Sequence, residues 1–369
     1  MIHMAPDFTN LDYAEEMSHA ALNTLTAPGD LVDRALVMND RATSGIAMPW
    51  SQLSGLYTMR PGELVLLAGG SGHGKSALAN QLALHAVTQT RPGTVTEDKP
   101  QGEPYRAAIA SLELPAEYVL HQMAGIAGTV ADPSEHWMRR VGYYLNERMI
   151  FVDRVDSMSP MEALQTAIGL RKFYGTDLFV LDGLMMIGLG DELEAQKIFT
   201  QKLAEVAKAF DICIVLICHM RKPAGGENAN RMPSAHDLLG SSNILNVASS
   251  CLLVHRDKEL MYKINAGEEY DPTHPHTRII VAKQRYAPYE GITRYWSHDK
   301  CRALCNSHSK QYRPIDIGAE DNWKRKPKSE TPQRIWSQGV EPTGTTPVRQ
   351  LRESTSETDS PTPMAQYPF

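Results

Sequence analysis

The middle of the chain alternates short apolar runs with segments whose apolar residues recur at helical spacing. Five of these runs have the length of a buried strand: residues 63–68, 107–111, 149–152, 178–181 and 212–218. They are nearly continuous in apolar character, which is typical of strands buried on both faces. The pattern therefore predicts a parallel sheet covered by helices on both sides.

Helix signals stand between these runs. Residues 77–88 have helical character, and residues 199–210 repeat apolar side chains at helical spacing. The segment 159–162 (Ser-Pro-Met-Glu) has the pattern of a capping box with proline at the first helical position, which predicts a helix to about residue 173. Pro115 indicates a further helix start.

After Ser250 the pattern becomes β-rich. Three apolar runs follow, at residues 251–255, 277–283 and 292–297. They predict strands that extend the sheet in an antiparallel manner. The expected fold is therefore α/β, with a mostly parallel central sheet and an antiparallel extension.

Composition narrows the class of protein. The 369 residues include 42% hydrophobic residues, enough for a sizeable core, and the net charge of −6 excludes a basic nucleic-acid coat. Nucleic acid remains a possible ligand if the basic groups gather in one groove. The cysteines are odd in number, and neither a secretory signal nor an apolar run of membrane length is present. We expect a cytoplasmic protein without membrane contact.

The two ends of the chain differ from its middle. From Arg313 onward the chain has 8 prolines and equal numbers of acidic and basic residues, with little apolar periodicity, so we expect a disordered tail over 313–369. Residues 1–42 contain helix-compatible stretches at 11–25 and 30–38, too short for a domain, and are interpreted as a leader. One folded domain is expected over 43–312.

A glycine-rich segment follows the first predicted strand and precedes a predicted helix. It matches the P-loop pattern in full and consists of Gly69, Gly70, Ser71, Gly72, His73, Gly74, Lys75 and Ser76. Glycines let backbone N–H groups turn toward phosphate oxygens, lysine supplies a charge near the β- and γ-phosphates, and the serine hydroxyl ligates Mg²⁺. The segment predicts binding of ATP, or another NTP or dNTP, with Mg²⁺; the alternative is a glycine-rich turn without nucleotide. His73 fills a variable position of the pattern.

Two acids follow predicted strands. Asp182 ends the fourth run, where it is placed to hold Mg²⁺ through water, although such an aspartate can also be a turn residue. Glu113 follows the second run, where it is placed to accept a proton from the attacking water. Glu113 taken alone is better interpreted as a helix-start residue, because Pro115 opens a helix there.

The order of these elements resembles a family. The P-loop, the segment Ser-Leu-Glu-Leu-Pro-Ala-Glu at 111–117, the strand-ending Asp182 and Ile-Cys-His at 217–219 are similar to the RecA-like motor of DnaB-type replicative helicases. The closer likeness is to the helicase halves of phage primase-helicases and mitochondrial Twinkle. It covers roughly residues 43–306. Thr-Ser-Gly at 43–45 resembles the family's entry motif, and Ala-Lys-Gln-Arg-Tyr at 282–286 resembles its late basic motif. The resemblance implies a RecA-like P-loop NTPase fold.

The resemblance implies a role for each matching residue. Glu113 matches the catalytic glutamate and Asp182 the Walker B aspartate, while His219 matches the residue that senses the γ-phosphate. Arg285, with Lys283 beside it, resembles the arginine finger donated to a neighbouring subunit's ATP. The positions that clamp the nucleobase in phage members correspond to Arg256 and Tyr295.

The same resemblance implies contact with single-stranded DNA. One family loop follows the histidine strand and here holds Arg221 and Lys222; the next corresponds to Gly240, Ser241, Ser242 and Asn243. Many members have arginine where this chain has Leu239, a departure that concerns DNA contact and not the ATPase. The implied function is a phage-encoded, ATP-dependent helicase that forms a homo-oligomeric, hexameric ring and moves 5′ to 3′. Residues 30–38 are the candidate for a helix that packs on the next subunit.

Two other functions stay open on the sequence. A RecA- or RadA-type recombination ATPase shares the core and its glutamate, although the late Lys-Gln-Arg motif favours a helicase. A nucleotide-gated scaffold that loads another helicase is the non-enzymatic alternative.

Three weaker signals remain. His298, Cys301, Cys305 and His308 have a spacing that zinc could use, but strand-edge packing is the favoured interpretation. The basic residues Lys324, Arg325, Lys326 and Lys328 are interpreted as a solvated tail. Residues 353–369 carry three acids and no base and end in Tyr-Pro-Phe, so docking of a replication partner is a hypothesis for this tail.

Overall fold

The computed structural model describes residues 28–29, 32, 45–154, 156–189, 192–220, 231–238, 242–310 and 315–317. Most of the expected leader and tail, including the basic cluster and the acidic end of the tail, therefore lies outside the described residues. At the start of the expected tail, Ile315 and Ile317 pack against the hydrophobic core, and the Ile315 N–H donates to the Ala127 carbonyl at 3.1 Å. Arg221, Lys222, Leu239, Gly240 and Ser241 lie outside the described residues as well, as do the side chains of Ser242 and Asn243. No helix in the described ranges is long and apolar enough to cross a membrane.

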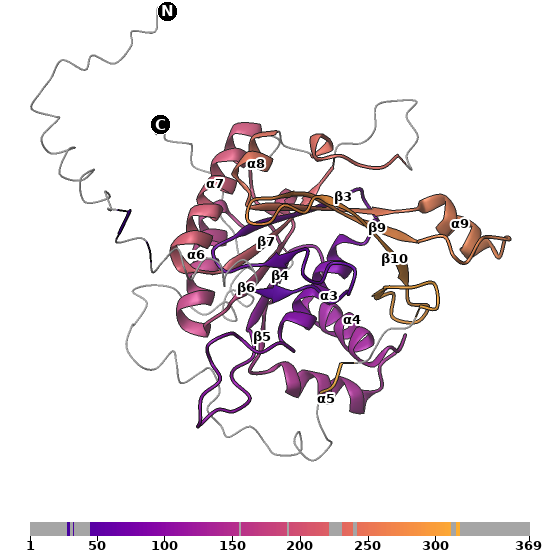
Figure 1. The fold of residues 1–369 in the computed structure, drawn as a ribbon, viewed down its shortest axis with the longest axis horizontal. Coiled ribbons are helices and arrows are strands. Elements are labelled where there is room, and N and C mark those ends of the chain that lie inside the picture. The colour runs from indigo at the N-terminus through magenta and orange to yellow at the C-terminus, as the bar shows by residue number, and fades with distance from the viewer. Residues whose placement is uncertain are drawn as a thin grey trace, which may run out of the picture. The chain divides into compact units, whose positions relative to one another are not determined.

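Within the described residues, one large sheet organises the chain (Figure 1). Its strands, in spatial order, are β11 (Leu304–Cys305), β10 (Gly291–Ser297), β9 (Thr277–Gln284), β8 (Ser250–Arg256), β3 (Leu64–Gly69), β7 (Cys213–His219), β6 (Leu178–Asp182), β4 (Ala107–Ser111) and β5 (Met149–Val152). Neighbouring strands from β8 to β5 are parallel, whereas the pairs β8–β9, β9–β10 and β10–β11 are antiparallel. The expected α/β fold with an antiparallel extension is confirmed. The first run of the β-rich region, however, joins the parallel part as β8.

Helices cover both faces of this sheet (Figure 1). One face carries α3 (Lys75–Ala86), α4 (Ala116–Gly128) and α5 (Glu135–Leu145). The other carries α6 (Pro160–Tyr174), α7 (Leu193–Phe210) and α8 (Ser242–Val247). The remaining elements are the β1 (Ile46–Ala47) and β2 (Thr58–Met59) pair, the 3₁₀ turns η1 (Leu184–Met186) and η2 (Ala235–Asp237), and α9 (Lys258–Ala266).

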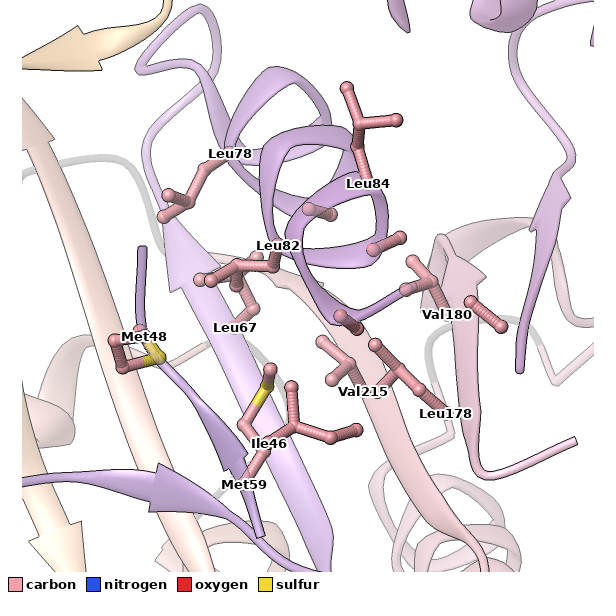
Figure 2. Packing of buried hydrophobic residues seen from close by; sticks show 14 of the residues in the cluster. Ile46, Met48, Met59, Leu67, Leu78, Leu82, Leu84, Leu178, Val180 and Val215 are labelled. Atoms are coloured by element: carbon pink, nitrogen blue, oxygen red, sulfur yellow. The ribbon is translucent and has the colours of Figure 1, made fainter. Parts of the chain in front are cut away.

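Strand β3 shows why the apolar runs are continuous. Successive side chains of a strand point to opposite faces, so a strand between two helical layers needs apolar residues at every position. Val65 and Leu67 belong to one hydrophobic cluster, while Leu64 and Leu66 belong to the other. In Figure 2, Leu82 of α3 lies against Leu67, and Leu78, Met48, Ile46 and Met59 belong to the same cluster around them. Each buried leucine of this kind stabilises the fold by about 1.5–3 kcal/mol.

The predicted capping box forms at the start of α6. The Ser159 hydroxyl accepts from the Glu162 N–H at 3.2 Å, and the Glu162 carboxylate accepts from the Ser159 N–H at 2.8 Å. The two side chains satisfy N–H groups that would otherwise have no partner at the helix start. These hydrogen bonds lower the pKa of Glu162 to about 2.

Candidate active site

The carboxyl ends of the parallel strands bring the predicted site residues to one edge of the sheet. In the strand register, Gly69 at the end of β3 lies opposite His219 of β7 and Val254 of β8. Ser111 at the end of β4 lies opposite Asp182 of β6. Ligands of open α/β sheets bind at this edge, because the loops that follow the strands converge there.

The P-loop connects β3 to α3 and has the backbone that its glycines permit. Gly72 and Gly74 have φ angles of 74° and 89°, in the left-handed region that residues with a side chain rarely adopt. A Cβ on Gly69 would lie 2.5 Å from the carbonyl oxygen of Val254, so neighbouring β8 also requires glycine there. Helix α3 begins at Lys75, which directs its N-terminal end toward the loop.

A cleft of about 690 Å³ opens at this edge. Its lining includes the P-loop residues 71–76, and it also includes Glu113, Asp182, His219 and Arg256, which come from four other strands or strand ends. The structure thus brings together most of the residues that the sequence predicted for nucleotide binding and catalysis. A cleft of this size can accommodate a nucleotide.

Asp182 and Ser76 form a pair at the floor of the cleft. Asp182 is 4% exposed, and burial raises the pKa of its carboxyl, while a hydrogen bond with the Ser76 hydroxyl lowers it. Burial also lowers the pKa of the Lys75 ammonium, against the opposing charges of Asp182 and Glu113. A hydroxyl beside one carboxylate suits Mg²⁺, which binds proteins through few ligands and completes its shell with water and phosphate oxygens.

Glu113 and His219 lie beside each other in the lining of the cleft. The Nε2 atom of His219 lies 3.5 Å from Oε1 of Glu113, and both side chains are partly exposed. The turn that carries Glu113 is held by the Ser111 hydroxyl, which accepts from the Leu114 N–H at 3.2 Å. The carboxylate is therefore fixed beyond β4 yet open to water, as a base for an attacking water requires.

The expected nucleobase pair is only half present. Arg256 lines the cleft, and its buried Nε has no hydrogen-bond partner among the described residues. Tyr295 is 0% exposed, with its ring centroid 5.0 Å from that of Trp50, so its ring is enclosed by the core. Its expected role as a clamp is corrected: alternation along β10 points Tyr295 into the protein, where a base cannot stack on it.

Arg285 and Lys283 lie at the opposite edge of the sheet. Because β9 is antiparallel to β8, Gln284 pairs with Ser250, the first residue of β8, while Thr277 pairs with Arg256 at the cleft. Along β8 this separation is about 20 Å. Lys283 Nζ donates to the carbonyls of Leu245 at 2.6 Å and Asn246 at 3.2 Å, and Arg285 also donates to Asn246.

The segments expected to contact DNA start at the carboxyl edge. Arg221 and Lys222 directly follow Met220, which forms an antiparallel bridge with Leu238. That bridge places Met220 and Leu238, the described residues that precede the two expected DNA segments, side by side. Ser242 and Asn243 begin the short helix α8.

The possible zinc residues do not form a metal site. Cys301 lines the cleft, Cys305 is buried on β11, and the ring of His308 lies 6.3 Å from that of Trp296. Within the described part of the chain, no group of three or more His, Cys, Asp or Glu side chains could hold a metal ion. Packing at the strand edge, the favoured interpretation, agrees with these positions.

Sequence reasoning missed several groups around the cleft. Lys300 and Arg302, on the turn between β10 and β11, line its wall, and Lys258 contacts the P-loop backbone. Lys258 follows Arg256 by two positions, which was a usable signal once Arg256 was suspected. No local pattern marks Lys300 or Arg302.

Comparison with known proteins agrees with the family that the sequence motifs resemble. The family model of the DnaB-like helicase C terminal domain matches residues 45–303. The replicative DNA helicase DnaB of Rickettsia bellii is 22% identical over 295 residues, covering 72% of this chain and 58% of the relative. The DNA helicase/primase of Enterobacteria phage T3 is 25% identical over 259 residues, covering 65% and 41%. The chain thus spans little more than half the length of the DnaB relative.

Solved structures share the fold. One solved ATPase domain aligns with a TM-score of 0.57 at 16% identity, over 81% of this chain and 99% of that domain. A DnaB-like replicative helicase, studied with its interactions with primase, aligns with a TM-score of 0.58 at 14% identity, over 80% and 71%. At these identities the likeness concerns the fold alone.

Proposed function

Because the chain belongs to the family of DnaB-like helicase C-terminal domains, we propose that it is the ATP-driven motor of a replicative DNA helicase that translocates on single-stranded DNA. The observation that carries this proposal is the cleft in which the P-loop, Glu113, Asp182 and His219 converge. A P-loop alone supports nucleotide binding. The added carboxylate base and the histidine beside it support hydrolysis coupled to movement.

The residues of the cleft divide the work of phosphoryl transfer. The P-loop amides and Lys75 hold the triphosphate, and Ser76 and Asp182 would hold Mg²⁺, which supplies charge neutralisation on the phosphate oxygens. Glu113 orients the attacking water and accepts its proton. His219, 3.5 Å from Glu113, responds to the γ-phosphate and passes its presence to the segment after β7. Arg256 contacts the nucleobase.

Arg285 supports an assembly of several subunits. It lies about 20 Å along the sheet from the P-loop of its own chain, too far to reach that nucleotide. We therefore propose that Arg285, assisted by Lys283, completes the site of a neighbouring subunit in a homo-hexameric ring. An arginine supplied in trans ties hydrolysis to subunit contact.

A ring would also explain how an acidic chain can bind DNA. The chain has a net charge of −6, so a few basic groups hold DNA only when several subunits present them to a common channel. We propose that Arg221, Lys222 and the segment Gly240, Ser241, Ser242 and Asn243 line that channel. Movement 5′ to 3′, a phage origin and a place in the host cytoplasm belong to the same proposal.

The division of the chain follows the same proposal. Residues 43–312 are the motor and residues 1–42 a leader whose helix packs on the next subunit. Residues 313–369 are a tail, disordered beyond Ile315 and Ile317, which pack against the core, and this tail docks replication partners. Deleting residues 353–369 should weaken partner binding and leave ATP hydrolysis intact. Unchanged partner affinity would contradict the docking role.

The test is DNA-stimulated ATP hydrolysis and fork unwinding by the wild type, Lys75→Ala and Arg285→Ala. Arg294→Ala is the matched control, because Arg294 is an exposed arginine on the neighbouring strand β10. We expect both activities to be lost in the first two variants and kept in the control. Mixing Lys75→Ala with Arg285→Ala should restore part of the hydrolysis, because some interfaces then combine an intact P-loop with an intact finger.

Each failure has its own meaning. Full activity of Arg285→Ala would contradict the shared site. Strand exchange without unwinding would favour a recombination ATPase, and slow turnover that DNA does not stimulate would favour a loading scaffold.

A further inference from the structure

Two side chains fasten the P-loop to the neighbouring strand β8 and the start of α9. We infer that His73 and Lys258 are positioning residues, which hold the phosphate cradle and Arg256 in a fixed mutual arrangement. The inference rests on the proposed function in one respect only, that the cleft binds a nucleoside triphosphate. It assigns a role to a loop position that the P-loop pattern leaves variable.

His73 accepts a hydrogen bond from β8. The side chain is 8% exposed, and its Nδ1 lies 3.0 Å from the backbone nitrogen of Arg256. A backbone N–H can only donate, so Nδ1 must carry the lone pair and the ring proton must sit on Nε2. Burial, helped by nearby cations, lowers the pKa of His73 to about 4, so the ring stays a neutral acceptor at physiological pH.

The ring of His73 also packs against the backbone of its own loop. A Cβ on Gly70 would lie 2.9 Å from the imidazole, so the ring packs directly on the Gly70 backbone. The carbonyl of Gly70 in turn accepts from Lys75 Nζ at 3.1 Å. A continuous set of contacts therefore runs from the phosphate-binding lysine through Gly70 and His73 to Arg256.

Lys258 contacts a second point of the loop. Its Nζ donates to the carbonyl oxygen of Ser71 at 2.9 Å. In a P-loop the N–H groups face the phosphates, which leaves carbonyls on the outer side in need of donors. Lys258 is the first residue of α9, and the preceding Asp257 caps that helix by accepting from the Leu260 N–H at 3.0 Å. The helix cap therefore fixes the backbone position of Lys258.

The contacts of His73 and Lys258 connect the parts of the protein that are expected to bind the two ends of the nucleotide. The loop cradles the phosphates, whereas the Arg256 side chain lines the cleft beyond them. If His73 fixes the distance between them, its loss should weaken a ligand that touches both ends more than one that touches the loop alone. ATP is the first kind of ligand and inorganic tripolyphosphate is the second.

The experiment uses the full chain and two substitutions of nearly equal shape. His73→Asn places an amide oxygen where Nδ1 lies, and His73→Leu keeps a similar volume without an acceptor. Binding of Mg·ATP and Mg·tripolyphosphate is measured by calorimetry, with thermal unfolding as the check of folding. We expect His73→Leu to weaken ATP about tenfold and tripolyphosphate about threefold, and His73→Asn to weaken ATP by no more than about threefold.

A double-variant cycle tests the link to Arg256. The double variant His73→Leu/Arg256→Ala should lose less ATP affinity than the product of the two single-variant losses. Each single substitution already removes the fixed position of Arg256 relative to the P-loop, so the second adds little. Lys258→Met should weaken ATP about threefold and Lys258→Arg should restore it, which keeps the inference testable if His73→Leu does not fold.

Contrary results are distinct from failure of the proposed function. Equal ATP affinities of His73→Asn and His73→Leu, or losses that multiply in the cycle, would overturn the positioning role. A wild type that binds Mg·ATP no better than Lys75→Ala would instead overturn nucleotide binding itself, and the inference with it.

Discussion

The two ends of the parallel strands carry similar charged side chains in different surroundings. At the amino edge, Asp177 is 3% exposed and pairs with Arg171 at 2.8 Å and Arg91 at 3.4 Å, while it also accepts from the Arg106 N–H at 3.0 Å. At the carboxyl edge, Asp182 is 4% exposed and is hydrogen-bonded to the neutral hydroxyl of Ser76. Two aspartates of nearly equal burial thus differ in what balances their charge.

This difference in charge compensation distinguishes an aspartate that stabilises the fold from one that serves the active site. A buried carboxylate is costly unless a cation or several donors compensate it. Guanidinium groups do so for Asp177. For Asp182, burial and the Glu113 charge raise the carboxyl pKa against the Ser76 hydrogen bond and the charges of Lys75 and His219. A buried acid in a cleft whose pKa is raised is typical of a functional site. The comparison therefore predicts that substitutions at the carboxyl edge impair hydrolysis and those at the amino edge impair the fold.

The largest effect is expected for Glu113→Gln. Gln keeps the shape of the side chain but cannot accept the proton of water, so the rate of ATP hydrolysis should fall about 10²–10⁴-fold. Nucleotide affinity and thermal stability should stay near those of the wild type. Glu63→Gln is the matched control at the amino edge, and steady-state ATPase assays compare the two. Equal losses in both variants would contradict the division between the edges.

A smaller effect, on stability, is expected for Asp177→Ala. The change removes two ion pairs and leaves the Arg106 N–H without its acceptor, which should lower the free energy of unfolding by about 3 kcal/mol. Asp299→Ala breaks an exposed pair with Lys310 and should cost less than about 1 kcal/mol. Urea unfolding measures both. A cost at Asp177 no greater than at Asp299 would show that the paired edge contributes little.

Much of the sheet could be predicted because its signal is local. The runs at 107–111 and 149–152 coincide with β4 and β5, and α6 begins where its capping box predicts. Helix α5 was not predicted, although Ser134 caps it, because its buried residues are only Val141 and Leu145 and its apolar stripe is short. The direction of β8 could not be predicted, because strand pairing depends on partners distant in sequence.

The site residues likewise divide into those that local sequence signals predict and those that depend on distant contacts. The P-loop, Asp182 and Glu113 each follow a predicted strand, so the topology of a parallel sheet was enough to expect them at one edge. Tyr295 was misjudged because its environment comes from Trp50, which is far away along the chain. The contact of His73 with Arg256 is equally long-range, and no residue pattern near His73 signals it.

The amino edge also predicts a pH dependence of stability. Burial raises the pKa of Glu63 from 4.5 to about 7, against the lowering effect of Arg60. The folded chain therefore binds this proton more tightly than the unfolded chain, and the stabilisation is complete below about pH 4.5 and lost as the pH rises through 7. Between pH 5 and pH 7 the wild type should lose about 2 kcal/mol relative to Glu63→Gln. Parallel pH profiles of the two proteins in urea unfolding would contradict the assignment.

Arg285 is the smallest test, because it is a charged group at the amino edge to which we assign no structural task. It is exposed, and its hydrogen bond goes to the Asn246 carbonyl at the end of α8, so Arg285→Ala should change the free energy of unfolding by no more than about 0.5 kcal/mol. Lys283 is less exposed and donates to two carbonyls, so Lys283→Met should cost about 1 kcal/mol. Urea unfolding of the two variants ranks them. Arg285→Ala could instead destabilise the fold as strongly as Asp177→Ala. Any loss of hydrolysis in that variant would then follow from the weakened fold. Arg285 would have a structural role at the amino edge, like Asp177, and the proposed contact with a neighbouring subunit's nucleotide would be contradicted.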